Sequence, residues 1–229
     1  MVFRVGTSSY LLINSSKNAF VVFTRLQVFS EPDVLIILGI TGAFGCGKSA
    51  VLRFFASRRW HTFDADAACK QLYADRVPEV MAAVREIFGD AMFGADGAVD
   101  LGRLGREAFR EPAKMPRLTA ALYPALTRRL RAAIAECRKR GRNGAFELPL
   151  LYEAGFEGEF DAVLAVWAPE TLRRQRLYGR HFDDAEIDRR SRMQLDADSK
   201  LEKADYAVIN SGTLADLDSQ LDELMQNWQ

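Results

Sequence analysis

The sequence contains few of the residues that build metal centres, histidine triads and disulfide frameworks. Its two histidines are His61 and His181, and its three cysteines, Cys46, Cys69 and Cys137, are widely spaced and form no Cys-x-x-Cys pair. Zinc-binding, triad-based and disulfide-stabilised classes are therefore not indicated. Three cysteines with no pairing pattern are typical of a reducing compartment, so we expect a cytoplasmic protein.

Net charge and long apolar runs are also lacking. Lysine plus arginine and aspartate plus glutamate each number 31 among 229 residues, so no overall field draws the chain to nucleic acid or to an anionic membrane. The apolar stretches at residues 10–13 and 19–23 are separated by polar residues and are too short for a membrane helix. We expect no nucleic-acid partner and no membrane partner, and no feature indicates an oligomeric state.

Apolar residues recur along the sequence at the spacings of strands and helices, as in a globular protein. Residues 1–33 are interpreted as an N-terminal extension, either an extra strand or an overlong start, with no assigned role. Strands are predicted at residues 34–38, 60–63, 145–151 and 161–167, the last two each preceded by a helix, and helices at residues 48–58, 66–88, 118–137 and 214–228. This alternation predicts an α/β fold with a parallel sheet flanked by helices.

A glycine-rich loop follows the first predicted strand, in the segment GITGAFGCGKSA at residues 39–50. Residues 42–49 fit the phosphate-loop pattern G-x-x-x-x-G-K-[ST]. Backbone N–H groups of such a loop cradle a phosphate chain at the positive end of the next helix. Lys48 is predicted to reach the β- and γ-phosphates and Ser49 to ligate Mg²⁺. A glycine-rich turn that binds nothing would leave this lysine and serine unexplained, and the missing N-K-x-D motif argues against a GTPase.

Two charged segments supply candidates for chemistry beside the phosphates. Asp64 and Asp66 end the second predicted strand, and ligands of open α/β sheets bind beyond the carboxyl ends of strands. A carboxylate there can orient a hydroxyl acceptor and take its proton, or it can cap the following helix. Arg176 and Arg180, in the arginine-rich segment 171–184, share one helix face, which is typical of a phosphate-binding lid and also of a solvated surface. The basic run at residues 138–142 lacks interleaved aromatic residues and is interpreted as a helix end and turn.

From about residue 35 to the C-terminus, a series of segments resembles the dephospho-coenzyme A kinases, a branch of the P-loop small-molecule kinases. The segments that agree with that family in order and spacing are ITGAFGCGKSAV (40–51), FDAD (63–66), DGAVD (96–100), LYPAL (122–126), PLLYE (149–153), the arginine-rich segment, RSRMQ (190–194), Lys200 and ADYAVINSG (204–212). The resemblance implies a P-loop kinase domain at residues 34–229, with a helical acceptor-binding region at about 67–137 and a helical lid at about 171–196.

The same resemblance implies a reaction and a set of site residues. ATP would phosphorylate the ribose 3′-hydroxyl of dephospho-coenzyme A, with Mg²⁺ held by Ser49, to give coenzyme A and ADP. Asp66, Lys48 and Arg180 are the implied catalytic residues. The implied ATP-binding residues are Gly42, Ala43, Phe44, Gly45, Cys46, Gly47, Lys48, Ser49, Ala50, Arg176 and Asn210. Thr41 and Glu153 match family positions near the site, without an assigned role.

The sequence departs from the family pattern at four positions. Tyr123 precedes Pro124 where the family has histidine, Leu101 replaces an arginine, Ala50 a threonine and Glu147 an aspartate. The changes at Tyr123 and Leu101 bear on the acceptor side more than on the ATP side. Two alternatives therefore stay open: a P-loop kinase for a different nucleoside or nucleotide acceptor, and a nucleotide-binding relative with impaired catalysis.

Overall fold

The computed structural model describes the backbone of residues 4–5, 8–9, 11–15, 19–23, 35–226 and 228. It describes the side chains within 35–226 and at 228, except those of residues 109 and 112. The chain forms two compact units, Met1–Phe63 with Glu136–Gln229 and Asp64–Ala135. Residues 24–33 of the N-terminal extension and Val34, the first residue of the first predicted strand, lie outside the described residues.

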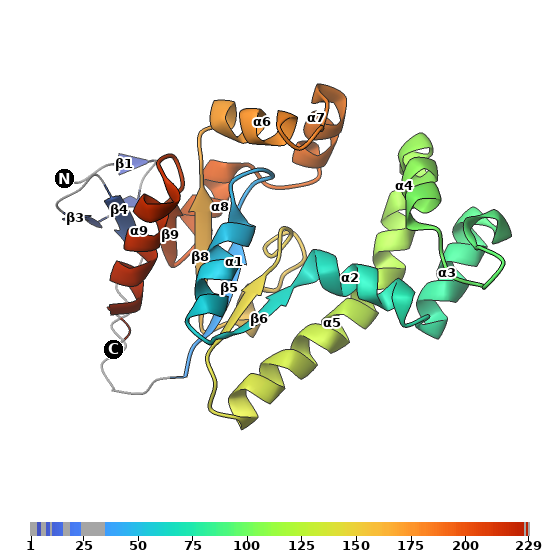
Figure 1. The fold of residues 1–229 in the computed structure, drawn as a ribbon, viewed down its shortest axis with the longest axis horizontal. Helices are drawn as coiled ribbons and strands as arrows, with labels where there is room; N and C mark the ends of the chain where they lie inside the picture. Colours follow the sequence, from blue (N-terminus) through green and yellow to red (C-terminus); the bar gives the residue numbers. More distant parts are fainter. Residues whose placement is uncertain are drawn as a thin grey trace. The chain divides into compact units, whose positions relative to one another are not determined.

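The main sheet of the first unit has the strand order β3-β4-β9-β8-β5-β7-β6 (Figure 1). Its strands are β3 (Leu11–Ser15), β4 (Ala19–Phe23), β5 (Ile37–Thr41), β6 (His61–Asp64), β7 (Gly144–Glu147), β8 (Ala162–Trp167) and β9 (Tyr206–Ile209). β5 pairs in parallel with β7 and β8, and β8 pairs in parallel with β9. The result is a five-stranded parallel sheet flanked by helices, which confirms the predicted fold class.

The N-terminal extension adds antiparallel strands at one edge of this sheet. β3 and β4 form a hairpin, and β4 pairs with β9 through Val21↔Val208, Val22↔Ala207 and Phe23↔Tyr206. Two shorter strands, β1 (Arg4–Val5) and β2 (Ser8–Ser9), pair with each other. The outer edge of β9 is thereby covered, which removes a row of backbone groups that another chain could bind.

Apolar burial against both faces of the parallel strands forms the core of the first unit. All residues of β5 and β7 are buried, as in strands covered on both sides by helices. The helices of this unit are α1 (Lys48–Ser57), α6 (Glu170–Tyr178), α7 (Asp184–Arg192), α8 (Ala197–Lys203) and α9 (Leu214–Gln226), with the 3₁₀ turn η3 (Glu157–Glu159). Trp60 packs on Phe55, with ring centroids 4.7 Å apart, and on Trp228, 5.9 Å apart, and so joins α1 to the chain end.

The second unit is helical. It contains α2 (Ala65–Ala74), α3 (Pro78–Phe88), α4 (Leu101–Arg110), most of α5 (Met115–Lys139) and the 3₁₀ turns η1 (Asp90–Met92) and η2 (Pro112–Lys114). In α5, which covers the helix predicted at residues 118–137, Leu126, Leu130 and Ile134 recur every four residues and are buried, whereas Arg128 and Arg131 are exposed. Within the described residues, no helix is both long enough and apolar enough to cross a membrane.

Three predicted strand features differ from the structure. The first strand is β5, Ile37–Thr41, and not residues 34–38; it includes Gly39, where a Cβ would lie 2.7 Å from the Phe160 ring. β7 ends at Glu147, two residues before Pro149, which lacks the N–H that a central strand needs. The prediction of a helix before β8 is wrong, because only the 3₁₀ turn η3 precedes it.

Candidate active site

The predicted phosphate loop connects β5 to α1. Gly42, Gly45 and Gly47 have φ angles of 151°, 82° and 99°, a region that residues with a Cβ rarely adopt. A Cβ at Gly47 would lie 2.1 Å from Asn210 Nδ2, and one at Gly42 would lie 2.4 Å from the carbonyl oxygen of Val166. Backbone conformation and close packing therefore both restrict these positions to glycine.

Lys48 and Ser49 open helix α1. The N-cap glycine offers no side-chain hydrogen bond and the first turn has no acidic residue, so the positive end of the helix has no anionic partner from its own first turn. Lys48 is buried, and its ammonium donates to the carbonyl oxygens of Gly42 at 3.0 Å and Ala43 at 3.3 Å. The lysine thus lies folded over the loop, whereas Ser49 is exposed and Ala50 half-buried.

Asn210 and Arg176, two predicted ATP-binding residues, contact this loop. Asn210 is buried directly after β9, and its Nδ2 donates to the carbonyl oxygen of Cys46 at 2.8 Å. Arg176 in α6 donates to the backbone and side-chain oxygens of Asn210, at 3.0 and 3.2 Å, and reaches the Cys46 carbonyl at 3.5 Å. The structure therefore brings the loop, α6 and the end of β9 together.

Helices α6 and α7 make up most of the segment predicted as a lid, residues 171–196, and lie beyond the end of β8 (Figure 1). We call this segment the lid. Arg173 donates to the carbonyl oxygens of Ala168 at 3.2 Å and Phe44 at 3.3 Å. Arg174 binds three carboxylates, those of Glu170, Asp184 and Asp188. Hydrogen bonds to Asp188 first, and then to Glu170 and Tyr178, raise the pKa of Arg174 above its ordinary value. Arg174 therefore ties α6 to α7.

The lid touches the loop through the aromatic ring of Phe44. This ring packs edge-to-face on Phe182, with centroids 5.2 Å apart, and the Arg190 guanidinium lies 5.2 Å from the first ring and 4.9 Å from the second. Arg180 is exposed, and its guanidinium lies 5.5 Å from the Phe182 ring. Sequence reasoning missed this cluster, because no local spacing links a loop residue to a distant lid arginine.

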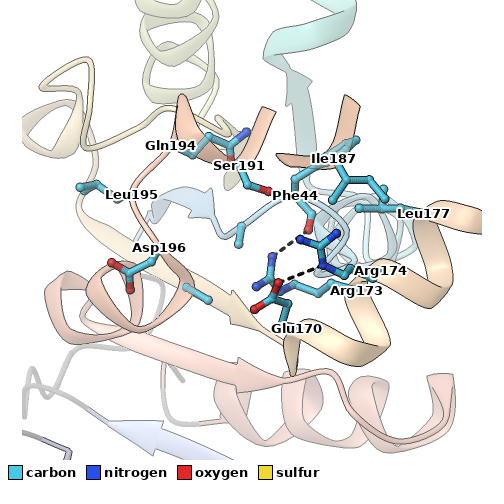
Figure 2. A pocket seen from close by; sticks show the side chains of 12 residues that line it. Phe44, Glu170, Arg173, Arg174, Leu177, Ile187, Ser191, Gln194, Leu195 and Asp196 are labelled. Atoms are coloured by element: carbon cyan, nitrogen blue, oxygen red, sulfur yellow. Dashed lines mark hydrogen bonds and ion pairs between the residues drawn. The ribbon is translucent and has the colours of Figure 1, made fainter. Parts of the chain in front are cut away.

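A pocket of about 210 Å³ lies between the outer turn of the loop and the lid (Figure 2). Figure 2 shows Glu170, Arg173 and Arg174 together on one side of it and Ser191 and Gln194 on another. Neither the loop glycines nor Lys48 and Ser49 line this pocket, and small-molecule sites are usually larger, about 300 Å³ or more. It is therefore not the predicted phosphate site.

Buried polar groups gather near the lid's C-terminal end. Lys200 in α8 is fully buried; its ammonium pairs with Glu153 at 3.0 Å and donates to the carbonyl oxygen of Pro149 at 2.5 Å. Glu153 also accepts from the N–H of Leu195 at 2.7 Å. Thr41, at the end of β5, is buried, and its hydroxyl has no hydrogen-bond partner among the described residues. No sequence pattern distinguishes a buried lysine such as Lys200 from a surface one.

The two candidate acceptor-side aspartates belong to the second unit and differ in their contacts. Asp64 is the N-cap of α2, and its carboxylate accepts from the N–H of Ala67 at 3.0 Å. Asp66 lies exposed in the first turn of α2, where no hydrogen bond to its carboxylate is found within the described part of the chain. Burial first, then Asp66 and Asp64, raise the pKa of Cys69 to about 11. The capping function thus belongs to Asp64 and leaves the Asp66 carboxylate available.

Comparison with known proteins identifies the family. The model of the dephospho-CoA kinase family matches residues 36–216, which is more than half of the chain. The chain belongs to the dephospho-CoA kinase family. The dephospho-CoA kinase of Anaeromyxobacter dehalogenans is 35% identical over 191 residues, 82% of this chain and 90% of the relative. That of Deinococcus radiodurans is 35% identical over 205 residues, 89% of this chain and 97% of the relative.

Solved structures share the fold of this chain. A Thermus thermophilus protein designated TT1252 superposes with a TM-score of 0.69 at 29% identity, over 85% of this chain and 98% of the other. The dephospho-CoA kinase from Campylobacter jejuni gives a TM-score of 0.64 at 20% identity, over 83% and 95% of the two chains, and shows the shared fold. The family model and the curated relatives confirm the predicted resemblance and the kinase class.

Residues that depart from the dephospho-CoA kinase pattern lie in both units. Leu101 is the first residue of α4 and is 40% exposed. Arg103, two residues further along α4, donates to the carbonyl oxygen of Ala91 at 2.6 Å. Tyr123 is half-buried in α5, and Glu147 is buried at the end of β7.

Proposed function

We propose that this protein transfers the γ-phosphoryl group of ATP to the ribose 3′-hydroxyl of dephospho-coenzyme A, giving coenzyme A and ADP. The observation that carries the proposal is the phosphate loop of a dephospho-CoA kinase family member, with three left-handed glycines and a buried lysine at the uncapped start of α1. Such a loop can bind a nucleoside triphosphate through backbone N–H groups and one cation.

The triphosphate is held by the loop amides and by Lys48. In the structure the Lys48 ammonium donates to two loop carbonyl oxygens. These neutral acceptors are weaker partners than phosphate oxygens, because hydrogen bonds to an ionised acceptor are shorter and roughly twice as strong. Lys48 therefore exchanges its loop carbonyls for the β- and γ-phosphates when ATP binds.

Ser49 fits the Mg²⁺ site that the family implies. Its side chain is exposed at the start of α1, and no group of three or more His, Cys, Asp or Glu side chains able to hold a metal occurs among the described residues. A single protein hydroxyl suits Mg²⁺, which keeps several waters and takes its other ligands from substrate phosphates. The ion neutralises charge on those phosphates when it is bound.

Asp66 orients the acceptor hydroxyl and receives its proton. Its carboxylate lies exposed in the first turn of α2, while Asp64 next to it carries the cap. The surrounding helical unit, residues 64–135, binds the acceptor. An ionised carboxylate within hydrogen-bond reach of the hydroxyl contributes typically about 10²- to 10⁴-fold to the rate of such a step.

Arg180 stabilises the charge of the transferring phosphoryl group, with Arg176 beside it at the loop. Arg180 is exposed near the turn between α6 and α7, where a small movement of the lid changes its reach. A planar guanidinium matches the charge spread over three phosphoryl oxygens. Both substrates of the proposed reaction are small polar metabolites, and we propose that the reaction takes place in the cytoplasm without a nucleic-acid or membrane partner.

Purified protein incubated with ATP, Mg²⁺ and a panel of acceptors tests this function. We expect ADP and coenzyme A in equal amounts with dephospho-coenzyme A, and little ADP with nucleosides or nucleoside monophosphates. A nucleoside monophosphate that is turned over in preference to dephospho-coenzyme A would overturn the acceptor assignment. ATP binding without turnover of any acceptor would indicate a relative that has lost catalysis.

A further inference from the structure

Lys200 is a cation enclosed within the first unit. It lies in α8, which packs against β8, and it has no exposed surface. A buried ammonium is costly unless charged and polar groups surround it. Glu153, 3.0 Å away, supplies the opposite charge, and the Pro149 carbonyl oxygen accepts at 2.5 Å. Lys200 therefore contacts two residues of the segment that follows β7.

Glu153 contacts both Lys200 and the C-terminal end of the lid. Its carboxylate accepts the N–H of Leu195 at 2.7 Å, three residues after the end of α7. The lid's first end is held separately, by Arg173 and Arg176, whose guanidinium groups donate to carbonyl oxygens of the phosphate loop. The lid is thus fixed at both ends, and the second attachment depends on the Lys200–Glu153 pair.

The same lysine lies in the electrostatic field of the phosphate loop. Burial lowers the pKa of Lys200, Glu153 raises it, and the positive charge of Lys48 lowers it again. A phosphate chain that neutralises Lys48 relieves this repulsion and so favours the charged Lys200–Glu153 pair.

We propose that Lys200 is a positioning residue for phosphoryl transfer, which acts through Glu153 to hold the C-terminal end of the lid in the arrangement that the reaction requires. The proposal rests on the function proposed above. Arg180 and Arg190 lie between the two lid attachments, so their placement depends on both ends. Positioning of this kind affects the transition state more than the bound nucleotide, because the loop supplies most contacts to ATP.

The test compares three variants with the parent protein. Lys200→Met removes the charge and keeps an unbranched side chain, and Glu153→Gln with Lys200→Met removes both charges, which avoids an unpaired buried carboxylate. Lys203→Met, an exposed lysine on the same helix, is the matched control. Steady-state kinetics with dephospho-coenzyme A give kcat and the KM for ATP, and the ratio of ADP to coenzyme A reports hydrolysis by water. Thermal melts show whether each variant is folded.

We expect both Lys200 variants to lose at least about tenfold in kcat, with the KM for ATP changed by less than about threefold. The ratio of ADP to coenzyme A should rise, because a loosely held lid excludes water less well. Lys203→Met should match the parent. If Lys200 had only a structural role, its variants would have a shifted melting temperature but would not show a lower kcat with a nearly unchanged KM for ATP.

Several results would overturn the proposal. One is a folded Glu153→Gln, Lys200→Met variant with the kcat of the parent protein. Another is a rise in the KM for ATP at unchanged kcat. A third is a double variant that does not fold, which would assign the Lys200–Glu153 pair to stability alone. A parent protein without activity on dephospho-coenzyme A would instead contradict the proposed function.

Discussion

At the scale of single residues, neighbours in the sequence have different structural roles. Asp64 and Asp66 are both acidic and only one residue separates them, yet the first caps α2 and the second points to no partner among the described residues. Arg174 and Arg176 are similarly close, but the first ties the two lid helices together and the second contacts the phosphate loop. Residue type alone therefore does not assign a role; the contacts that each side chain makes do.

Replacing Asp66 by asparagine tests its proposed role. We expect Asp66→Asn to lower kcat by about a hundredfold or more and to leave the Kd for ATP nearly unchanged, because only the acceptor loses its base. Asp64→Asn is the control, since asparagine also caps helices well and should keep most activity. Steady-state kinetics and ATP titration measure both. The opposite pattern, with Asp64→Asn inactive and Asp66→Asn active, would move the base to Asp64.

Lys48→Ala gives the contrasting outcome for the phosphate side. Loss of the loop cation should weaken ATP binding and lower the rate together, since Lys48 faces the phosphates before and during transfer. The two variants thus separate acceptor chemistry from nucleotide binding.

At the scale of elements, the short helix α8 connects the lid to the core. Its N-cap is Asp196, whose carboxylate accepts from the N–H of Ser199 at 2.8 Å and from its hydroxyl at 2.7 Å. Asp198 in the same turn accepts from the Trp167 indole at 2.8 Å. A helix of this length is stabilised by such contacts rather than by its own propensity. The position of Lys200 therefore depends on how this helix begins.

Removing the cap should destabilise the protein. We expect Asp196→Ala to lower the free energy of unfolding by about 0.5 to 2 kcal/mol, because the N–H groups of the first turn lose their acceptor. Urea denaturation measures the change, with Glu202→Ala, an exposed residue of the same helix, as the control. An equal loss in both variants would argue against the cap as the cause.

At the scale of the whole chain, the parallel sheet and the helical unit serve different steps of the proposed reaction. The carboxyl ends of β5 and β8 lead into the phosphate loop and the lid, so the proposed contacts to ATP all lie at the carboxyl ends of the parallel strands. The acceptor is assigned to residues 64–135. β6 leads directly into that unit, and the half-buried His61 is the first residue of β6.

The stability of the fold should depend on the ionisation of His61. Burial first, then the charges of Arg142 and Arg140, lower the pKa of His61 below its ordinary value. The unfolded chain then binds more protons than the folded one, so stability is lost as pH falls through about 6.5. Between pH 8 and pH 5.5 we expect the melting temperature of His61→Gln to fall about 1 to 3 °C less than that of the parent.

The second histidine provides the control for this measurement. His181 is exposed in the turn between α6 and α7. We expect His181→Gln to show the same pH dependence of the melting temperature as the parent. Parallel curves for all three proteins would show that His61 does not contribute to acid destabilisation.

The fold class, the phosphate loop, the start of α1 and the buried face of α5 can all be predicted from the amino-acid sequence. Each of these depends on residues close together in the chain: glycine spacing, a helix start, or apolar residues every three or four positions. Other features depend on contacts between segments that are distant in the sequence and are seen only in the structure. They are the strand order, the end of β7, the Phe44–Phe182–Arg190 cluster and the burial of Lys200. The physical reason is that local patterns set backbone conformation, whereas the partner of a buried charge is chosen by how separate elements pack.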